Sequence, residues 1–495
     1  MTRNPLRILS FATSLLLVAC AVGPDYSRPA VPGNKAYPAP GSTPTSATDV
    51  PGGESQRFDP GIQIAADWYQ LFESPKLNAL ISDALNDNPT LEGAQARLRK
   101  ARYQLATFDS ALYPHVDANL GVGREKTNGS TLGLSSITNT FNLYSVGLSV
   151  NYDIDIAGMD RRAVESGQAR VAAEQYALIG TYLTLIDNLV VTALRVATTQ
   201  DEISATESII ANDQQELDVV RAQERAGTVT RVDVLRATSQ LAAEQATLPR
   251  LRQELTAYQT QLAILSGTDP GTFQVPHLTM ADFKLPVVLP YSVPSDLVRQ
   301  RPDILQSESQ LHAANAAVGV ATANLYPHIM LTAGYGGLSN DSGSLTSATA
   351  RTWELGGALL APIFHGGELR AERDAAVEDY KTSFAQYRST VLSAFGQVTD
   401  TLSAIRNDAD TLQAEYSALT SADASRNLVQ LQYRRGAVQY LDVLTDERSY
   451  FRADLAYIDA LGQRYIDTAG LYQALGGGWW NATSSTQGAA PGAAD

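Results

Sequence analysis

The chain is poor in the residues from which most enzyme and metal sites are built. It has one cysteine, Cys20, among 495 residues, which excludes an intrachain disulfide and a cysteine-based metal cluster. Its five histidines are scattered without the spacing of metal ligands, and its four methionines do not cluster. It lacks a Walker loop, a nucleophile elbow, a zinc-protease motif and a dinucleotide fingerprint. We therefore expect neither an enzyme, nor a metal site, nor a bound cofactor.

Positive charge is also scarce. The chain has 37 Lys and Arg against 52 Asp and Glu, for a formal net charge of −15. Binding to nucleic acid needs a basic face, so we expect no nucleic-acid partner. The acidic excess fits either a soluble, self-repelling surface or an acidic lumen, and charge alone does not choose between them.

The first twenty residues have the composition of a secretory signal. Two arginines precede an apolar run from residue 8 to 18, which is too short to span a bilayer as a mature helix. The run ends in Leu17-Val18-Ala19-Cys20, which resembles the bacterial lipobox. We predict cleavage before Cys20 and a lipid on its thiol; an ordinary signal peptide with an incidental cysteine is the alternative. Ala21, where inner-membrane lipoproteins usually carry Asp, implies sorting to the outer membrane.

Proline and glycine are absent from two long stretches. No proline occurs from 115 to 248 or from 363 to 490, and Gly227 is the only glycine from 181 to 266. Such stretches permit very long helices. A helix over 160–225 would be roughly 100 Å long at 1.5 Å per residue, and it would need helical neighbours, as in a coiled coil.

The breaks in this pattern predict where the helices end. Gly227 should end the long helix, and a second helix, kinked at Pro249, should return toward Ser266. By contrast, residues 21–75 contain nine prolines, which predicts an extended, poorly packed arm.

Short segments between the helices alternate apolar and polar residues. In 144–155 the alternation is strict, and 116–125 shows it too. The segments 329–335 and 353–363 carry a weaker form. Two-faced strands about ten residues long are typical of membrane barrels. Ordinary sandwich hairpins beside a soluble coiled coil are the alternative interpretation.

The chain contains an internal duplication. His115 and His328 end the same Leu-Tyr-Pro-His sequence, 213 residues apart, and the segment from Gly227 is echoed 209 residues later from Gly436. A nearly constant shift over so long a stretch indicates two copies, each expected to be one structural unit with its partners in its twin. Each copy is predicted to contain a helix, two strands, a long helix, a turn and a return helix.

Four strands per chain cannot close a barrel, because about eight is the minimum. An open edge is not tolerated in lipid, so several chains must share one barrel. Three chains would supply twelve strands and four would supply sixteen; the strand number alone does not decide.

Several short blocks resemble one protein family. The sequence from Cys20 through Gly23-Pro24-Asp25-Tyr26 to Pro29 is similar to the N-terminus of outer-membrane efflux lipoproteins, the NodT-type branch of the TolC-like outer membrane factors. Further blocks match at 68–77, 301–303, 361–367 and 475–479. The resemblance runs from Cys20 to about Trp480.

The resemblance implies an α+β membrane protein that works as a homotrimer. Four strands per chain would complete one shared 12-stranded barrel in the outer membrane, and the long helices would form a coiled-coil tunnel through the periplasm. Residues near 60–85, 268–300 and the chain end would form an equatorial belt. A periplasmic membrane-fusion adaptor and an inner-membrane pump, of the RND type, would complete the conduit. The chain would then be a passive efflux duct, held in outer-membrane lipid by its barrel and by the lipid on Cys20.

The two helix–helix turns gain a role from the resemblance, because in the family they form the periplasmic tip where the tunnel narrows and the adaptor docks. The implied tip residues are Gly227, Thr230, Asp233, Tyr433, Gly436 and Asp442. A carboxylate at the start of a helix also suits the helix dipole, so capping is an alternative role for both aspartates. For Asp442 we favour an acidic ring at the closed aperture, where three carboxylates would attract cations, with Tyr433 supplying a hydrogen bond.

The sequence departs from the family at Val438, where a basic partner of Asp233 is expected. Arg231, Arg434 and Arg435 are the candidate substitutes for that partner in a salt-bridge latch at the tip.

The resulting division of the chain has six parts. They are a signal peptide at 1–19, an extended lipidated arm at 20–66, a first repeat at 67–267 with strands at 114–127 and 141–157 and a turn at 227, an equatorial linker at 268–300, a second repeat at 301–476 with strands at 327–338 and 351–364 and a turn at 436, and a flexible tail at 477–495.

Two other functions stay open at this point. The same duct would serve a type I protein secretion system, although the lipidated N-terminus favours efflux. A non-conducting coiled-coil scaffold of the envelope is disfavoured by the paired strands. The cargo is not readable from the sequence, because pump specificity lies in another chain.

Overall fold

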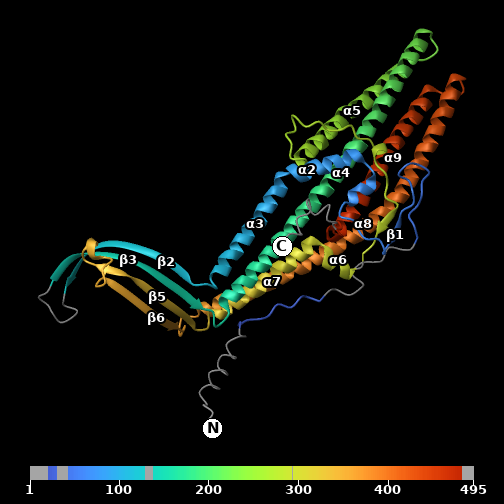
Figure 1. Cartoon of the computed structure of the whole chain (residues 1–495). Helices are drawn as coiled ribbons and strands as arrows, with labels where there is room; N and C mark the ends of the chain where they lie inside the picture. The colour runs from blue at the N-terminus through green and yellow to red at the C-terminus, as the bar shows by residue number, and fades with distance from the viewer. Residues whose placement is uncertain (1–20, 31–42, 129–137, 293, 482–495) are drawn as a thin grey trace. The chain divides into compact units, whose positions relative to one another are not determined.

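The computed structural model describes residues 21–30, 43–128, 138–292 and 294–481 (Figure 1). The predicted signal peptide and Cys20 lie outside these residues. The described residues form two compact units. Unit 1 consists of the described residues within 1–29, 98–174 and 307–387. Unit 2 consists of the described residues within 30–97, 175–306 and 388–495. Each unit draws on both copies, so the copies are not separate structural units as expected, because strands and helices of one copy pack on those of the other.

The two copies form the same series of helices, equal in length pair by pair. The matched pairs are α3 (Pro89–Ser110) with α7 (Pro302–Ala323), 22 residues each; α4 (Met159–Arg225) with α8 (Glu368–Arg434), 67 each; and α5 (Arg231–Leu265) with α9 (Tyr440–Ala474), 35 each. The shift between copies is 213 residues for the first helices and 209 for the later ones. The second copy is therefore shorter, and the difference falls within its strand pair.

Helix α4 begins one residue before the predicted start and ends at the predicted Arg225. Its apolar residues at helical spacing are fully buried at Ile186, Leu189, Val190 and Leu194. Among the described residues, α4 holds the one apolar helical window long enough to cross a membrane, and 67% of that window is buried within the chain. The window thus belongs to the core of the helical bundle, where apolar residues on several sides of a helix find partners. The return helix α5 continues through Pro249.

Unit 1 contains a four-stranded antiparallel sheet in the order β2-β3-β5-β6. The strands are β2 (His115–Asn128), β3 (Thr138–Ile154), β5 (His328–Ser339) and β6 (Arg351–Leu360). All four lie where the alternating pattern predicted strands. β6 ends at Leu360 rather than at the expected residue 364, since Pro362 has no N–H to continue the ladder. β3 joins β5 across the two copies, with Ile154 opposite Ile329.

The alternating residues separate onto two faces of this sheet. Leu120 lies opposite Val146, and Tyr335 lies opposite Trp353, so apolar side chains gather on one face. Tyr335 and Trp353 are 60% and 77% exposed. An exposed apolar face of this kind suits a strand that borders lipid.

The N-terminal arm is extended but not poorly packed, which corrects the expectation from composition. In unit 2, β1 (Arg57–Asp59) pairs in parallel with β4 (Val288–Pro290). The buried side chain of Gln56 donates to the backbone oxygen of Pro286 at 2.9 Å and to Oγ1 of Thr468 at 3.0 Å. The prolines keep the chain extended, while these tertiary hydrogen bonds hold it in place.

The three segments expected to form an equatorial belt come together in unit 2. Trp68 is 1% exposed and stacks on Tyr472 of α9, with ring centroids 5.0 Å apart and planes at 4°. The backbone N–H of Lys284 donates to the oxygen of Phe72 at 2.8 Å. Helices α2 (Pro75–Asp87) and α6 (Pro294–Gln300) complete this region.

The predicted flexible tail begins later than expected. Gly478 has φ +70°, and a Cβ there would lie 2.4 Å from the backbone oxygen of Ile64. The indole Nε1 of Trp479 donates to the oxygen of Gln300 at 2.8 Å. Residues 477–481 are therefore packed, and 482–495 lie outside the described residues.

Candidate functional site

Two glycine turns join the long helices to their return helices. Gly227 and Gly436 have φ of +76° and +72°, a left-handed backbone that glycine adopts without strain. The N–H of Thr228 donates to Gln223 and that of Ala437 to Gln432, at 3.0 and 2.9 Å, which closes both helices with the same C-terminal motif. A Cβ at either glycine would meet nothing within 4 Å, so backbone conformation, and not space, requires glycine.

Both predicted tip aspartates cap the helix that follows. Asp233 Oδ2 accepts from the N–H of Thr230 at 3.0 Å and from its hydroxyl at 2.7 Å. Asp442 Oδ2 accepts from the N–H of Gln439 at 2.9 Å. Each carboxylate is thus half of a capping box. The hydrogen bonds from Thr230 hold the pKa of Asp233 below its usual range.

The basic partner of Asp233 within the chain is Arg236, not one of the three candidates. Nη1 of Arg236 lies 3.6 Å from Oδ1 of Asp233. Arg231 instead lies 3.6 Å from Glu224. The spacing of Asp233 and Arg236, three residues apart on one helix, was the signal in the sequence that pointed to this pair.

Tyr433 links the two turns. Its hydroxyl donates to Oε1 of Gln223 on α4 at 2.7 Å, and its ring lies 5.6 Å from that of Tyr440. Beneath it, an apolar cluster joins the two helix hairpins through Leu217, Val220, Val234, Ala237, Leu241, Tyr440 and Val443. We call this cluster the tip core.

The two turns differ in burial and charge at one equivalent pair, Arg231 and Tyr440. Tyr440 is 4% exposed within the tip core, whereas the side chain of Arg231 is 69% exposed. The second hairpin therefore contributes the buried ring of Tyr440, and the first presents the charged side chain of Arg231 to solvent.

A cluster of acids beside the tip core was not foreseen. Asp213, Glu216 and Glu447 lie on α4 and α9, and two of them border a cavity of about 470 Å³ with Gln223 and Tyr433. Burial, and then the charges of Glu447 and Glu244, raise the pKa of Asp213 to about 7. Burial, and then Glu447 and Asp213, raise the pKa of Glu216 to about 7. In the sequence these two acids share a helical stripe with the tip-core residues Leu217 and Val220, which was the available signal.

In unit 1, the arm that follows Cys20 is held against the first turn of α4. The N–H of Val22 donates to the oxygen of Ala157 at 2.9 Å. Arg162, 5% exposed, binds Asp25 and Glu165 at 2.7 Å each.

The arm also contacts α7 within unit 1. Tyr26 stacks on His312, with ring centroids 4.2 Å apart, and Arg28 binds Glu308 at 2.7 Å. Gly23 has φ +97° and lies so close to Gly319 that a Cβ would come within 2.5 Å of it. Four residues of the block that carried the family resemblance, Gly23, Asp25, Tyr26 and Arg28, thus contact α4 or α7.

The buried acids make the stability of the tip depend on pH. A carboxyl whose folded pKa is raised keeps a proton that the unfolded chain releases, so stability falls as pH rises from about 4 to about 7. We expect backbone amides around Leu217 to exchange hydrogen faster at about pH 8 than at about pH 5.5, after correction for intrinsic rates. Glu216→Gln should reduce this difference; Asp218→Asn, an exposed neighbour on α4, should leave it unchanged. Equal pH dependence in both variants would show that the cluster does not control the tip.

The chain matches known proteins over most of its length. Residues 80–268 and 293–477, the two copies, match the family model described as outer membrane efflux protein. Similar proteins include the pyoverdine export outer membrane protein OpmQ of Pseudomonas aeruginosa, 31% identical over 83% of this chain and 87% of that protein. The probable efflux pump outer membrane protein TtgC of Pseudomonas putida is 30% identical over 96% of each chain. The cation efflux system protein CusC of Escherichia coli O6:H1 is 29% identical over 96% of this chain and 99% of that protein.

Solved structures show the same fold. The outer-membrane channel OprN is 28% identical, with a TM-score of 0.84 over 93% of this chain and all of that chain. A structure of CusC is 26% identical, with a TM-score of 0.78 over 92% of this chain and 99% of that chain. Members of the family are channels rather than enzymes, and they function with an adaptor and an inner-membrane pump in efflux systems. The chain thus belongs to the outer membrane efflux protein family: it is an efflux channel of the TolC-like fold that lies in the outer membrane and extends into the periplasm.

Proposed function

We propose that three copies of this chain form one conduit, with twelve strands closing a barrel and the paired turns forming its periplasmic aperture. The observation that carries the proposal is the open sheet of unit 1, whose end strands β2 and β6 each have one neighbour in the described residues. An open edge is not tolerated in lipid, and four strands are too few to close. A periplasmic adaptor would dock at the turns and an inner-membrane pump of the RND type would deliver the cargo.

The cargo class is small molecules or ions rather than proteins. The similar proteins are named for pyoverdine export, for cation efflux and as an efflux pump component. None of those printed names refers to protein secretion, so they favour an efflux role over the type I alternative.

Deletion of the gene should lower the tolerance of the host to a subset of drugs, detergents or metals, and the wild-type chain should restore it. The purified protein should conduct ions in planar bilayers, because the conduit is passive. A protein that never conducts would support the scaffold alternative. A deletion that leaves every tolerance unchanged but blocks release of an exported protein would support secretion.

At the aperture, we assign Asp442 to a ring of three carboxylates. The Asp442 side chain is exposed, and it also accepts the N–H of Gln439 at the start of α9. One carboxylate therefore supplies both the charge and the capping bond. Three such groups around one axis would attract cations and oppose anions.

Two substitutions of Asp442 separate these roles. Asp442→Asn keeps an oxygen to cap Gln439 but removes the charge, so it should weaken cation block of the channel without loosening the turn. Asp442→Ala removes both the charge and the acceptor; it should also increase leak, since the N–H of Gln439 loses its partner in the capping box. Single-channel recordings measure both effects, with Asp233→Asn as the matched control on the other turn. Unchanged conductance and cation block in both Asp442 variants would contradict the assignment of Asp442 to a carboxylate ring.

We also assign a covalent lipid to Cys20. Ala21, the next residue, lies against Gly158 in the connection between β3 and α4. A Cβ on Gly158 would be 2.5 Å from the Cα of Ala21. This connection is at the end of the sheet from which the helices emerge, so the described arm begins at this end of the sheet, one residue after the predicted lipid site.

Mass spectrometry of the mature protein should show diacyl or triacyl modification at Cys20, absent in Cys20→Ser. The serine variant should keep its barrel and its conductance, because the described contacts of the arm through Val22, Asp25 and Tyr26 are left unchanged. An unmodified thiol in the wild-type protein, or cleavage at another position, would contradict the assignment.

A further inference from the structure

The sheet of unit 1 ends in two strands, β2 and β6, whose outer edges have no strand partner in the described residues. Within the part of the chain that the structure describes, β2 pairs only with β3, and β6 pairs only with β5. All ten residues of β6 are exposed. In the proposed trimer, a strand of a second copy covers each free edge. The junction described here therefore rests on the proposed function. The open question is which residue meets which.

The chain contains its own template for the missing junction. By the duplication, β3 corresponds to β6 with a shift of 209 residues at their helix-side ends, and β2 corresponds to β5 with a shift of 213. The pair of β3 with β5 inside the chain is therefore equivalent to a pair of β6 with β2 of another copy. Since β3 and β5 run antiparallel, the junction between copies is antiparallel too.

The two hairpins test whether these shifts hold residue by residue. In the first hairpin, His115 lies opposite Asn151. Shifting these positions by 213 and 209 gives His328 opposite Leu360, which is the pair observed in the second hairpin. The duplication is thus preserved in strand register, and the same shifts can be applied to the junction.

We propose that β6 pairs with β2 of a second copy in the register that places Leu359 opposite the partner's Leu120. The template is Val150 opposite Ala333 in the observed pair of β3 with β5. The same register places Ala361 opposite the partner's Ala118.

The alternation of side chains supports this register independently. Leu359 shares a face with Ile329, and Leu120 shares one with Val146, so both leucines lie on the apolar face. A slip of one residue would turn the apolar face of one strand to the polar face of its neighbour. Slips of two residues keep the faces matched, and the internal template selects among these.

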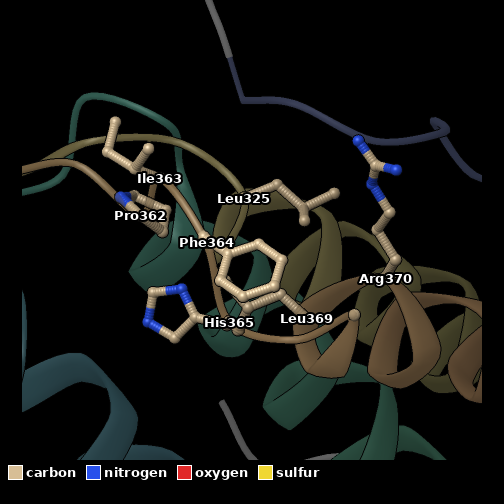
Figure 2. Close-up of a pocket in the computed structure, with 8 residues that line it drawn as sticks. Leu325, Pro362, Ile363, Phe364, His365, Leu369 and Arg370 are labelled. Carbon is tan, nitrogen blue, oxygen red and sulfur yellow. The ribbon is translucent and has the colours of Figure 1, made fainter.

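Exposure at equivalent positions also points to a missing neighbour. Ile154 and Ile363 correspond in the two copies, yet they are 38% and 90% exposed. Ile154 lies beside β5, whereas Ile363 would lie beside the partner's Val116. Ile363 and the 87% exposed Phe364 border a pocket of about 360 Å³ that continues from the end of β6 (Figure 2).

Cysteine pairs test the register directly. Leu359→Cys combined with Leu120→Cys should give disulfide-linked dimers and trimers on non-reducing gels of isolated outer membranes. Directly opposed Cβ atoms lie about 4.5–5.5 Å apart and diagonal ones about 7–8 Å apart, and a disulfide needs about 3.5–4.5 Å. Leu359→Cys paired with Ala118→Cys or with Val122→Cys should therefore crosslink severalfold less. The wild-type chain, with Cys20 as its only cysteine, gives the background.

The outcomes separate the register from the proposed assembly. Strongest crosslinking through Ala118 or Val122, or none in channels that remain trimeric and conducting, would overturn the register and leave the channel intact. Absence of trimers in the wild-type protein would overturn the assembly itself. If the leucine pair prevents folding, Ala118→Cys with Ala361→Cys tests the same register with small residues.

A second measurement uses charge instead of crosslinking. In this register Glu354 lies opposite the partner's Glu125, whereas within one chain they occupy opposite edges of the sheet. Opposed like charges destabilise a strand pair. Glu125→Gln and Glu354→Gln should each raise the melting temperature of the detergent-solubilised trimer, and the double variant should gain no more than the larger single effect. Additive effects, or none, would show that the two carboxylates do not meet.

Discussion

Pairing of backbone hydrogen bonds within the membrane is the constraint on which this molecule depends. The described residues of unit 1 form a sheet of four antiparallel strands, and its end strand β6 is exposed at every residue. Because lipid supplies no hydrogen bonds to a free strand edge, the sheet is a fragment that only further copies can complete. The requirement for several copies thus follows from one chain, as does the exposure of Ile363 and Phe364 beside the open edge.

The duplication is how one sequence builds a repeating tube. Helices of 22, 67 and 35 residues recur in both copies, and the strand registers agree between the two hairpins. Such repetition gives each junction between copies an equivalent inside the chain. It also leaves the few places where the copies differ to carry distinct chemistry, as at the tip, where Tyr440 is buried and Arg231 is exposed.

The tip combines stability with charge in the same groups. Asp233 and Asp442 hold the starts of the return helices through capping bonds. Asp213 and Glu216 lie beside the apolar tip core, where burial raises the pKa of both toward neutrality. Ionisation of these carboxyls at higher pH is therefore expected to weaken the packing of the two hairpins at this end of the helices.

The sequence by itself determined the periodic features: the duplication, the long helices free of proline and glycine, the alternating strands and the glycine turns. These depend on local spacing, which the chain carries directly. Tertiary structure decided what spacing cannot express. It showed that the proline-rich arm is anchored through Gln56, that residues 477–481 are packed, and that the copies share compact units. Each of these rests on contacts between residues far apart in the chain or on side-chain geometry, whose energies no local pattern records.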